Sequence, residues 1–228
     1  MCSIIGYSGS EIAAPIIVKG LKRMEYRGYD SVGVATESEN QIELKKGTGK
    51  VTEVNSKFQL DTLPGRIGIG HTRWATHGKV TDLNAHPHPS NSGKIAIVHN
   101  GIIENFEELK KQLEDDGYSF KSETDSEIIA NLLQKNYEST KNVKDTIMKT
   151  VSAIKGHYAF VAMFENGQLA AARFHEPLII GVGQENIFLS SDVLGFIEYT
   201  DNAIYMLSLI HISEPTRRRG ISGGGVVG

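Results

Sequence analysis

Hydrophobic residues in the first third of the chain follow first a strand pattern, then a helix pattern, then two further strands. Residues 3–7 form a short, apolar and β-branched run, which is typical of a buried strand. Across residues 12–24 the apolar positions recur at spacings of three and four, so we predict a helix with one buried face. Residues 32–36 and 41–46 have strand character and are joined by the turn-forming residues 38–40, which predicts a hairpin.

The middle of the chain contains a long polar segment between two apolar ones. Residues 66–72 and 94–99 alternate around isoleucines and are predicted to be core strands. Residues 73–93 between them are rich in glycine, proline, asparagine and histidine. Because a loop of about 20 residues without its own secondary structure is more often functional than idle, we expect part of the functional site here.

The second half predicts helices first and then strands. Asn105 with Glu108, and Thr124 with Glu127, have the spacing of helix-capping pairs, and a third helix is expected over residues 143–154. Strands are expected at residues 157–164, 168–174, 178–182 and 186–189, the first two joined by a tight Asn166-Gly167 turn. Strands in runs, separated by a run of helices, predict an α+β fold. We expect two antiparallel sheets packed together with helices outside, not a parallel βαβ sheet.

Composition and charge narrow the functional class. The 228 residues are 39% hydrophobic and 22% charged with a formal net charge of −3, which is typical of one large globular domain. There is no basic excess to attract nucleic acid or anionic lipid, so a small-molecule partner is expected. No apolar run approaches the ~18 residues of a membrane span, and the start lacks the pattern of a secretory signal. We expect a cytoplasmic protein without nucleic-acid or membrane partners.

The sequence changes character after Met206. The last twenty residues lack the helix or strand periods that would join a core, and they carry a basic cluster unlike the rest of the chain. We therefore predict a domain at residues 1–206 and a non-native or disordered tail at residues 207–228. Residues 207–217 resemble the translation of transposon-end adapter DNA used in sequencing libraries, and a flexible linker is the alternative.

Histidines are concentrated in and beside the polar loop. Five of the eight lie between His71 and His99, which raises the question of a metal site. His86 and His88 are only two residues apart around a proline, and neither an H-E-x-x-H nor a C-x-x-C pattern occurs. We expect no metal and no cofactor. The alternative is a metal site formed by three ligands that converge in space. For a single histidine here, a hydrogen-bonded loop or core residue is the default.

Cys2 is the single cysteine of the chain and follows directly on Met1. If Met1 is removed, this residue carries both a thiol and a free α-amine, whose reference pKa values are about 8.5 and about 7.7–8.0. At neutral pH the amine is then substantially available as a base for the thiol, as nucleophilic catalysis requires. The alternative is an inert buried cysteine.

Several strings of residues carry a resemblance to a known family. With the N-terminal cysteine, the sequence resembles the N-terminal glutaminase domain of the glucosamine-6-phosphate synthase family, which is a class II glutamine amidotransferase. The resemblance runs from Met1 to about Met206. It rests on residues 25–31 (EYRGYDS), 71–78 (HTRWATHG), 84–88 (NAHPH), 99–105 (HNGIIEN) and 122–125 (SETD).

The resemblance implies a fold and a reaction. The fold is that of an N-terminal nucleophile hydrolase, a four-layer αββα sandwich. The reaction is hydrolysis of L-glutamine to glutamate and ammonia through a thioester on Cys2, with Asn100 and Gly101 stabilising the oxyanion.

The resemblance also implies which residues bind the substrate. Arg73 pairs with the α-carboxylate of glutamine, Asp125 holds the α-ammonium, Thr76 and His77 make further contacts, and Trp74 gates the passage of ammonia. His86 is implied to give structural support near the site. Judged from the residues alone, Arg73 could be a surface cation and Asp125 the cap residue of a helix.

Two departures from the family matter for function. Ser3 stands where the family usually has glycine, so we expect crowding beside the nucleophile and reduced activity. The family's two sugar isomerase domains, which bind fructose 6-phosphate, are absent from this sequence, and the full-length enzyme is expected to be a homodimer. A catalytically impaired glutamine-binding module is therefore the alternative function.

Overall fold

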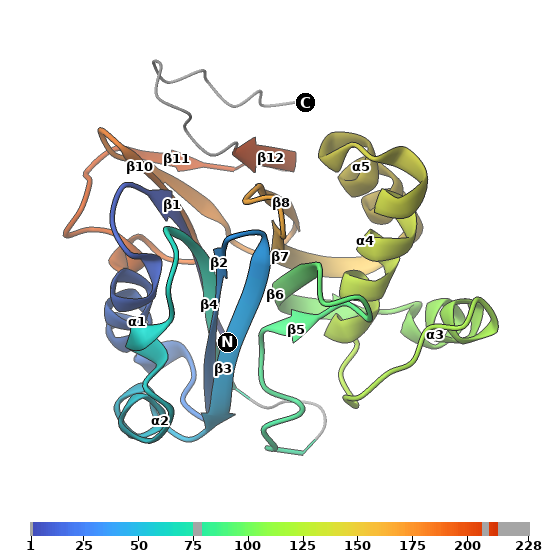
Figure 1. Cartoon of the computed structure of the whole chain (residues 1–228), viewed down its shortest axis with the longest axis horizontal. Helices are drawn as coiled ribbons and strands as arrows, with labels where there is room; N and C mark the ends of the chain where they lie inside the picture. Colours follow the sequence, from blue (N-terminus) through green and yellow to red (C-terminus); the bar gives the residue numbers. More distant parts are fainter. Residues whose placement is uncertain (1, 75–78, 207–209, 214–228) are drawn as a thin grey trace.

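Two antiparallel sheets form the centre of the protein (Figure 1). The structure, a computed structural model, describes residues 2–74, 79–206 and 210–213. Among these residues, seven strands form the first sheet in the order β11-β9-β10-β1-β4-β2-β3. Their bounds are β1 (Ser3–Gly9), β2 (Ser31–Ser38), β3 (Gln41–Thr48), β4 (Ile67–Arg73), β9 (Ile179–Val182), β10 (Asn186–Ser190) and β11 (Ala203–Tyr205).

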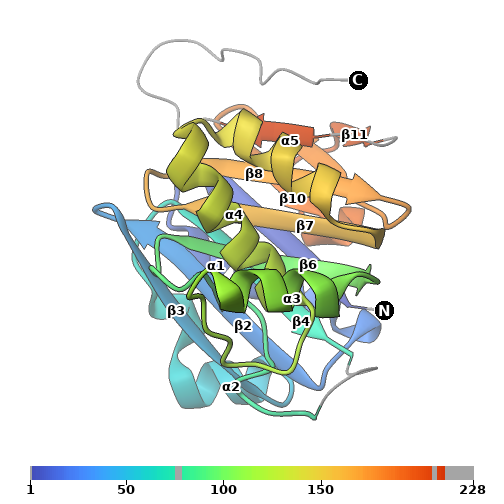
Figure 2. The ribbon, with the colours of Figure 1, turned by 90° about the vertical axis from the view of Figure 1, so that its right-hand side faces the viewer.

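The second sheet and the helices complete the layers. Within the described part of the chain the second sheet has five strands in the order β12-β8-β7-β6-β5. These are β5 (His88–Pro89), β6 (Ile95–Ile103), β7 (Gly156–Phe164), β8 (Leu169–Phe174) and β12 (Ile210–Ser213). The α-helices are α1 (Ala13–Arg23), α2 (Val51–Phe58), α3 (Phe106–Asp115), α4 (Ser126–Thr140) and α5 (Val143–Ala153). Figures 1 and 2 show α1 and α2 outside the first sheet, and α3, α4 and α5 beside the second.

Alternation along the strands creates three apolar layers between these four structural layers. In β1, Ile5 and Tyr7 face the cluster that contains the buried side of α1, whereas Ile4 faces the cluster between the sheets. In β7, Phe160 packs in the cluster of α4 and α5, and Val161 points into the inter-sheet cluster. Fully burying one such side chain contributes about 1.5–3 kcal/mol, so the alternating pattern fixes the sandwich. The predicted α+β sandwich of two antiparallel sheets is confirmed.

Most predicted elements are present, with small differences in their ends. The hairpin at residues 38–40 is a two-residue turn with Glu39 and Asn40 at positive φ, and Gly167 likewise closes the turn between β7 and β8. Helix α1 requires a glycine on its buried face, because a Cβ at Gly20 would lie 2.5 Å from Ile5 Cδ1 and 2.7 Å from Gly195 O. The short helix α2 was not predicted, since its pattern spans only two turns.

The two predicted capping pairs are wrong. Asn105 precedes α3, but its side chain bonds Ala153 O and Lys155 N instead of the helix. Helix α4 begins one residue later than the Thr124–Glu127 pair requires, and the Glu127 carboxylate accepts hydrogen bonds from Lys121 N and Ser122 N. In both cases the side chain that the local spacing assigned to the helix end makes its hydrogen bonds to residues outside that helix.

The C-terminal part differs from its prediction at four residues. Ile210–Ser213 form strand β12, antiparallel to β8, so the expectation that no strand after Met206 joins the core is wrong here. The proposed adapter origin of residues 207–217 stays a prediction. Met206 itself is buried, and its carbonyl accepts a hydrogen bond of 2.6 Å from Arg173 Nη1.

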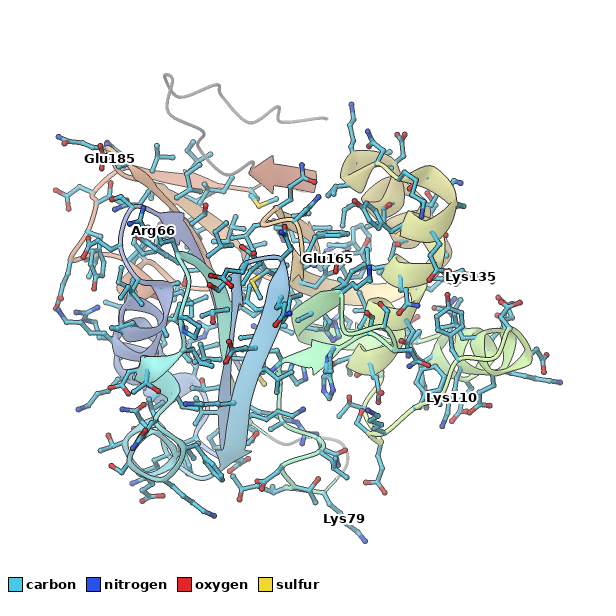
Figure 3. The ribbon with its side chains drawn as sticks, viewed as in Figure 1. Arg66, Lys79, Lys110, Lys135, Glu165 and Glu185 are labelled. Carbon is cyan, nitrogen blue, oxygen red and sulfur yellow. The ribbon has the colours of Figure 1, made fainter. Side chains whose placement is uncertain are left out.

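Many charged side chains lie on the outside of the sandwich, whereas Arg73 and Glu127 are buried. Figure 3 shows Lys110, Lys135 and Glu185 extending away from the sheets. Among the described residues, no helix is both long and apolar enough to cross a membrane.

Candidate active site

Cys2 stands at the start of β1, a strand in the interior of the first sheet. Its carbonyl oxygen accepts hydrogen bonds from Asn100 Nδ2 at 3.1 Å and from Arg27 Nε at 3.2 Å. The backbone N–H of Trp74 donates to Sγ at 3.2 Å. Burial raises the pKa of the Cys2 thiol, and the hydrogen bond from Trp74 and the charges of Arg73 and Arg27 act in the opposite direction. Hydrogen bonds therefore hold Cys2 at both its backbone carbonyl and its sulfur. Because burial raises the pKa of the thiol, a base is needed to remove its proton.

Asn100 lies on β6 in the second sheet and reaches across to the first. Its amide nitrogen contacts the Cys2 carbonyl, and its Oδ1 lies 3.0 Å from Nε2 of His71. His71 belongs to β4, which is the neighbour of β1 in the first sheet. The side chain of Asn100 is thus held between the strand of the cysteine and the strand beside it.

Gly101 follows Asn100 and lines the same cavity. Its φ of +119° lies in the region that favours glycine, and a Cβ there would be 2.0 Å from His157 O. No other residue fits this position without moving β7. A glycine lets a bound carbonyl approach the backbone closely, as an oxyanion donor must.

Asp125 occupies the N-cap position of α4 but does not cap the helix with its side chain. Its Oδ2 accepts a hydrogen bond of 2.8 Å from Ile103 N at the end of β6. Ser126 Oγ lies 3.4 Å from Asp125 Oδ1 and 2.8 Å from Nδ1 of His99. The alternative that Asp125 is the cap residue of a helix is therefore confirmed by its position, although its side chain makes no cap, and its carboxylate also lies at the cavity wall.

Arg73 ends β4 and is almost buried, which excludes the alternative of a surface cation. Its Nη1 donates to Lys79 O at 3.3 Å, and Asn84 Nδ2 donates to the same carbonyl at 3.0 Å. Asn84 Oδ1 in turn accepts from Glu123 N at 2.9 Å. Burial lowers the pKa of the guanidinium, but arginine stays charged at any physiological pH. Asn84 therefore links the loop after Arg73 to the loop before Asp125.

The histidines between the sheets are buried and neutral. The rings of His71 and His86 stack at 4.2 Å between centroids, and His86 Nδ1 accepts from His99 N. Burial lowers the pKa of His71 to about 3 and holds those of His86, His88 and His99 below their ordinary value. Within the described ranges, no group of three or more His, Cys, Asp or Glu is arranged to hold a metal ion.

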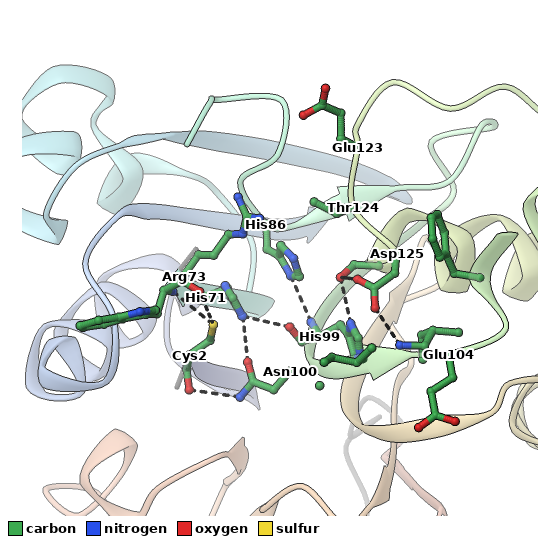
Figure 4. A pocket seen from close by; sticks show the side chains of 16 residues that line it. Cys2, His71, Arg73, His86, His99, Asn100, Glu104, Glu123, Thr124 and Asp125 are labelled. Atoms are coloured by element: carbon green, nitrogen blue, oxygen red, sulfur yellow. Dashed lines mark hydrogen bonds between the residues drawn. The ribbon is translucent and has the colours of Figure 1, made fainter. Parts of the chain in front are cut away.

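These residues surround one cavity of about 380 Å³. Figure 4 shows Cys2 and Asp125 toward opposite ends of it, with His71, His99 and Asn100 between them. Trp74 lines the same cavity, is 42% exposed and packs edge-on against Tyr29 at 5.5 Å between ring centroids. A cavity with a nucleophile at one end and a carboxylate at the other can hold an extended molecule that carries a cationic group.

The structure brings together the predicted residues that it describes: Cys2, Arg73, Trp74, Asn100, Gly101 and Asp125 all line the cavity. Thr76 and His77 lie outside the described residues. Ser3 does not line the cavity, and its Oγ donates to Met24 O at 2.9 Å. No role was predicted for Arg27, His71 or Asn84 from the sequence. Each lies in one of the strings that carried the resemblance, which is the signal that could have drawn attention to it.

A cysteine at the start of an interior strand, in a sandwich of two antiparallel sheets between helices, defines the class of N-terminal nucleophile hydrolases. The profile described as a glutamine amidotransferase domain matches residues 71–197, more than half of the 228 residues. The chain belongs to this glutamine amidotransferase family.

Relatives and solved structures agree with this assignment. The glutamine--fructose-6-phosphate aminotransferase (isomerizing) of Pyrococcus horikoshii is 50% identical over 208 residues, covering 90% of this chain and 35% of that protein. The enzyme of the same name from Methanococcus maripaludis is 46% identical, again with 90% and 35% coverage. The glutamine phosphoribosylpyrophosphate amidotransferase of B. subtilis is 30% identical with a TM-score of 0.78, covering 92% of this chain and 47% of that one. The chain thus spans about a third of the length of these aminotransferases.

Proposed function

We propose that this domain hydrolyses L-glutamine to L-glutamate and ammonia with Cys2 as the nucleophile. One observation carries the proposal: the Cys2 thiol, the Asn100 amide and Gly101 line one cavity with Arg73 and Asp125. A nucleophile, oxyanion donors and two opposite charges are what cleavage of an amino-acid side-chain amide requires.

The reaction begins once Met1 has been removed and Cys2 has a free α-amine. The amine takes the thiol proton, and Sγ forms a bond to the side-chain amide carbon of glutamine. The negative charge on the amide oxygen is stabilised by Asn100 Nδ2 and by the backbone N–H of Gly101. The C–N bond then breaks, the leaving nitrogen takes the proton and departs as ammonia, and a thioester remains. Water hydrolyses the thioester to glutamate and restores the thiol.

The two ends of the substrate are held by opposite charges. The guanidinium of Arg73 pairs with the α-carboxylate, because its planar fork matches the two carboxylate oxygens. Asp125 accepts hydrogen bonds from the α-ammonium. Thr76 and His77 make further contacts with glutamine, and Trp74, at the exposed side of the cavity, gates the passage of ammonia.

The ammonia has a proposed destination outside this chain. The relatives named glutamine--fructose-6-phosphate aminotransferase are almost three times as long as the segment they share with it. We propose that the domain is the ammonia-producing half of such an enzyme, which transfers the nitrogen to fructose 6-phosphate in its isomerase domains. The full-length enzyme is expected to be a cytoplasmic homodimer.

Glutamate release from L-glutamine by the purified chain tests the proposal. We expect turnover in the unaltered chain and its loss in Cys2→Ala, with glutamine binding retained in calorimetry. Turnover that survives Cys2→Ala would exclude Cys2 as the nucleophile. Glutamine binding without turnover in a chain whose intact mass lacks Met1 would favour the impaired binding module instead.

A further inference from the structure

His71 is a buried histidine without an assigned role that contacts a proposed oxyanion residue directly. It is 1% exposed, lies on β4 and stacks on the ring of His86. Its Nε2 is 3.0 Å from Asn100 Oδ1 and 3.1 Å from the carbonyl oxygen of His99. One ring nitrogen therefore serves two consecutive residues of β6.

The partners of Nε2 determine where the proton of the ring lies. A backbone carbonyl can only accept a hydrogen bond, so the contact with His99 O requires a proton on Nε2. Nδ1 has no partner among the described residues, so nothing there competes for the proton. Because a neutral imidazole carries one proton, the ring is in the Nε2–H form. The low pKa of about 3 that burial gives His71 keeps this form across the neutral range.

The protonated Nε2 determines the orientation of the Asn100 amide. An N–H at this position needs Oδ1 opposite it, and the Cys2 carbonyl on the other side needs Nδ2. Turning the amide by 180° would set N–H against N–H at His71 and oxygen against oxygen at Cys2. In the observed orientation one proton of Nδ2 is bonded to Cys2 O, and the second is available to a bound carbonyl oxygen.

The geometry points to His71 as the positioning residue of the oxyanion hole: its Nε2–H locks the Asn100 amide with the donor toward the Cys2 side of the cavity. The inference rests on the proposed glutaminase function of the same site. It predicts that His71, although it is among the residues that line the cavity, affects the transition state through Asn100 and not by binding the substrate.

Kinetics of glutamate release separate this role from a merely structural one. Removing an oxyanion donor typically lowers kcat by about 10²–10³. We expect His71→Leu to lower kcat at least about tenfold while KM changes less than about twofold, since ground-state binding is untouched. His71→Gln, which keeps a donor, should recover part of the loss. In an Asn100→Ala background His71→Leu should have little further effect, because both changes remove one function. Equal losses in the two backgrounds would overturn the proposal.

A matched control comes from the next residue on the same strand. Thr72 is also fully buried, and its hydroxyl has no partner among the described residues. Thr72→Val should keep kcat within about twofold, and thermal unfolding of every variant shows whether it is folded.

Nitrogen-15 NMR of the histidine rings tests the same contact without turnover. The long-range correlation spectrum of the unaltered chain should show His71 as the Nε2–H tautomer, with a signal that shifts in Asn100→Ala. An Nδ1–H tautomer would overturn the proposal even in an active enzyme. Absence of glutaminase activity together with the Nε2–H tautomer would overturn the proposed function instead, leaving the orientation of Asn100 intact.

Discussion

The carboxylate of Asp125 accepts a hydrogen bond from the backbone N–H of Ile103 at 2.8 Å, which ties the start of α4 to the end of β6. Asn100 and Gly101 lie on the same strand, three and two residues before Ile103, respectively. The proposed ammonium-binding residue and the proposed oxyanion donors are therefore connected through one strand end. Positioning both on regular elements gives the site a precision that a loop would not give.

Because Asp125 accepts this hydrogen bond and is also proposed to bind the ammonium, we expect different substitutions of Asp125 to affect substrate binding and stability separately. Asp125→Asn keeps an oxygen for Ile103 but loses the charge that holds the ammonium. A hydrogen bond to a charged group contributes about 2 kcal/mol, so KM for glutamine should rise roughly 30-fold. Stability should stay within about 1 kcal/mol in urea unfolding. Asp125→Ala leaves the buried N–H of Ile103 unpaired and should cost a further 1–3 kcal/mol, roughly, in unfolding free energy. An unchanged KM in Asp125→Asn would contradict the assigned role.

Ser3 leads to an expectation opposite to the one that the sequence suggested. Its hydroxyl donates to Met24 O on the far side of β1 from the cavity, so it does not crowd the nucleophile. Ser3→Gly should leave kcat within about twofold and lower the unfolding free energy by about 1 kcal/mol through loss of this buried hydrogen bond. Steady-state kinetics and urea unfolding measure the two effects. A large gain in kcat would show that Ser3 obstructs catalysis after all.

Local sequence patterns predict the elements of this fold better than the partners of polar side chains. The alternation of Ile4 and Ile5 between two apolar layers follows from strand geometry alone. Local spacing could not show that Asn105 bonds the end of α5, because its partners are 48 and 50 positions away. The contact of His71 with Asn100 spans 29 positions and joins two sheets, so it depends on how the sheets pack. The site residues could be predicted only through the resemblance to the family, because members of a family share the packing that brings such residues together.

The buried histidines predict acid sensitivity. His71, His86, His88 and His99 have pKa values below 6.5 in the folded protein because of burial. Below about pH 6.5 the unfolded chain binds protons at these residues that the folded chain does not, so stability falls as pH falls. Each histidine contributes up to about 1.4 kcal/mol per pH unit.

Urea unfolding between pH 7 and pH 5 measures this dependence before most carboxylates titrate. The unaltered chain should lose stability steeply over this range. His88→Gln should reduce the slope by about one proton, whatever its effect on stability at pH 7. A slope that the substitution does not change would show that His88 titrates alike in both states.

Lys46 predicts that stability also depends on pH on the alkaline side of neutrality. Its ammonium donates to the carbonyls of Leu83, Ala85 and Pro87, and so holds the segment that carries His86 against β3. Burial lowers the pKa of this ammonium to about 8, from an ordinary value of 10.5. Between these two pH values the unfolded chain keeps a proton at Lys46 that the folded chain releases. Stability from this residue therefore rises with pH across that range, by up to about 1.4 kcal/mol per pH unit.

Comparison of the unaltered chain with Lys46→Met isolates the effect. The difference in unfolding free energy between the two should be constant from pH 6 to pH 7.5, where the lysine is charged in both states. Above pH 8 it should increase in favour of the unaltered chain until about pH 10.5. The substitution also leaves three carbonyls without their donor, which should lower stability at every pH by about 1–3 kcal/mol. A difference that stays constant up to pH 10.5 would mean that the three carbonyls stabilise the ammonium enough to offset its burial.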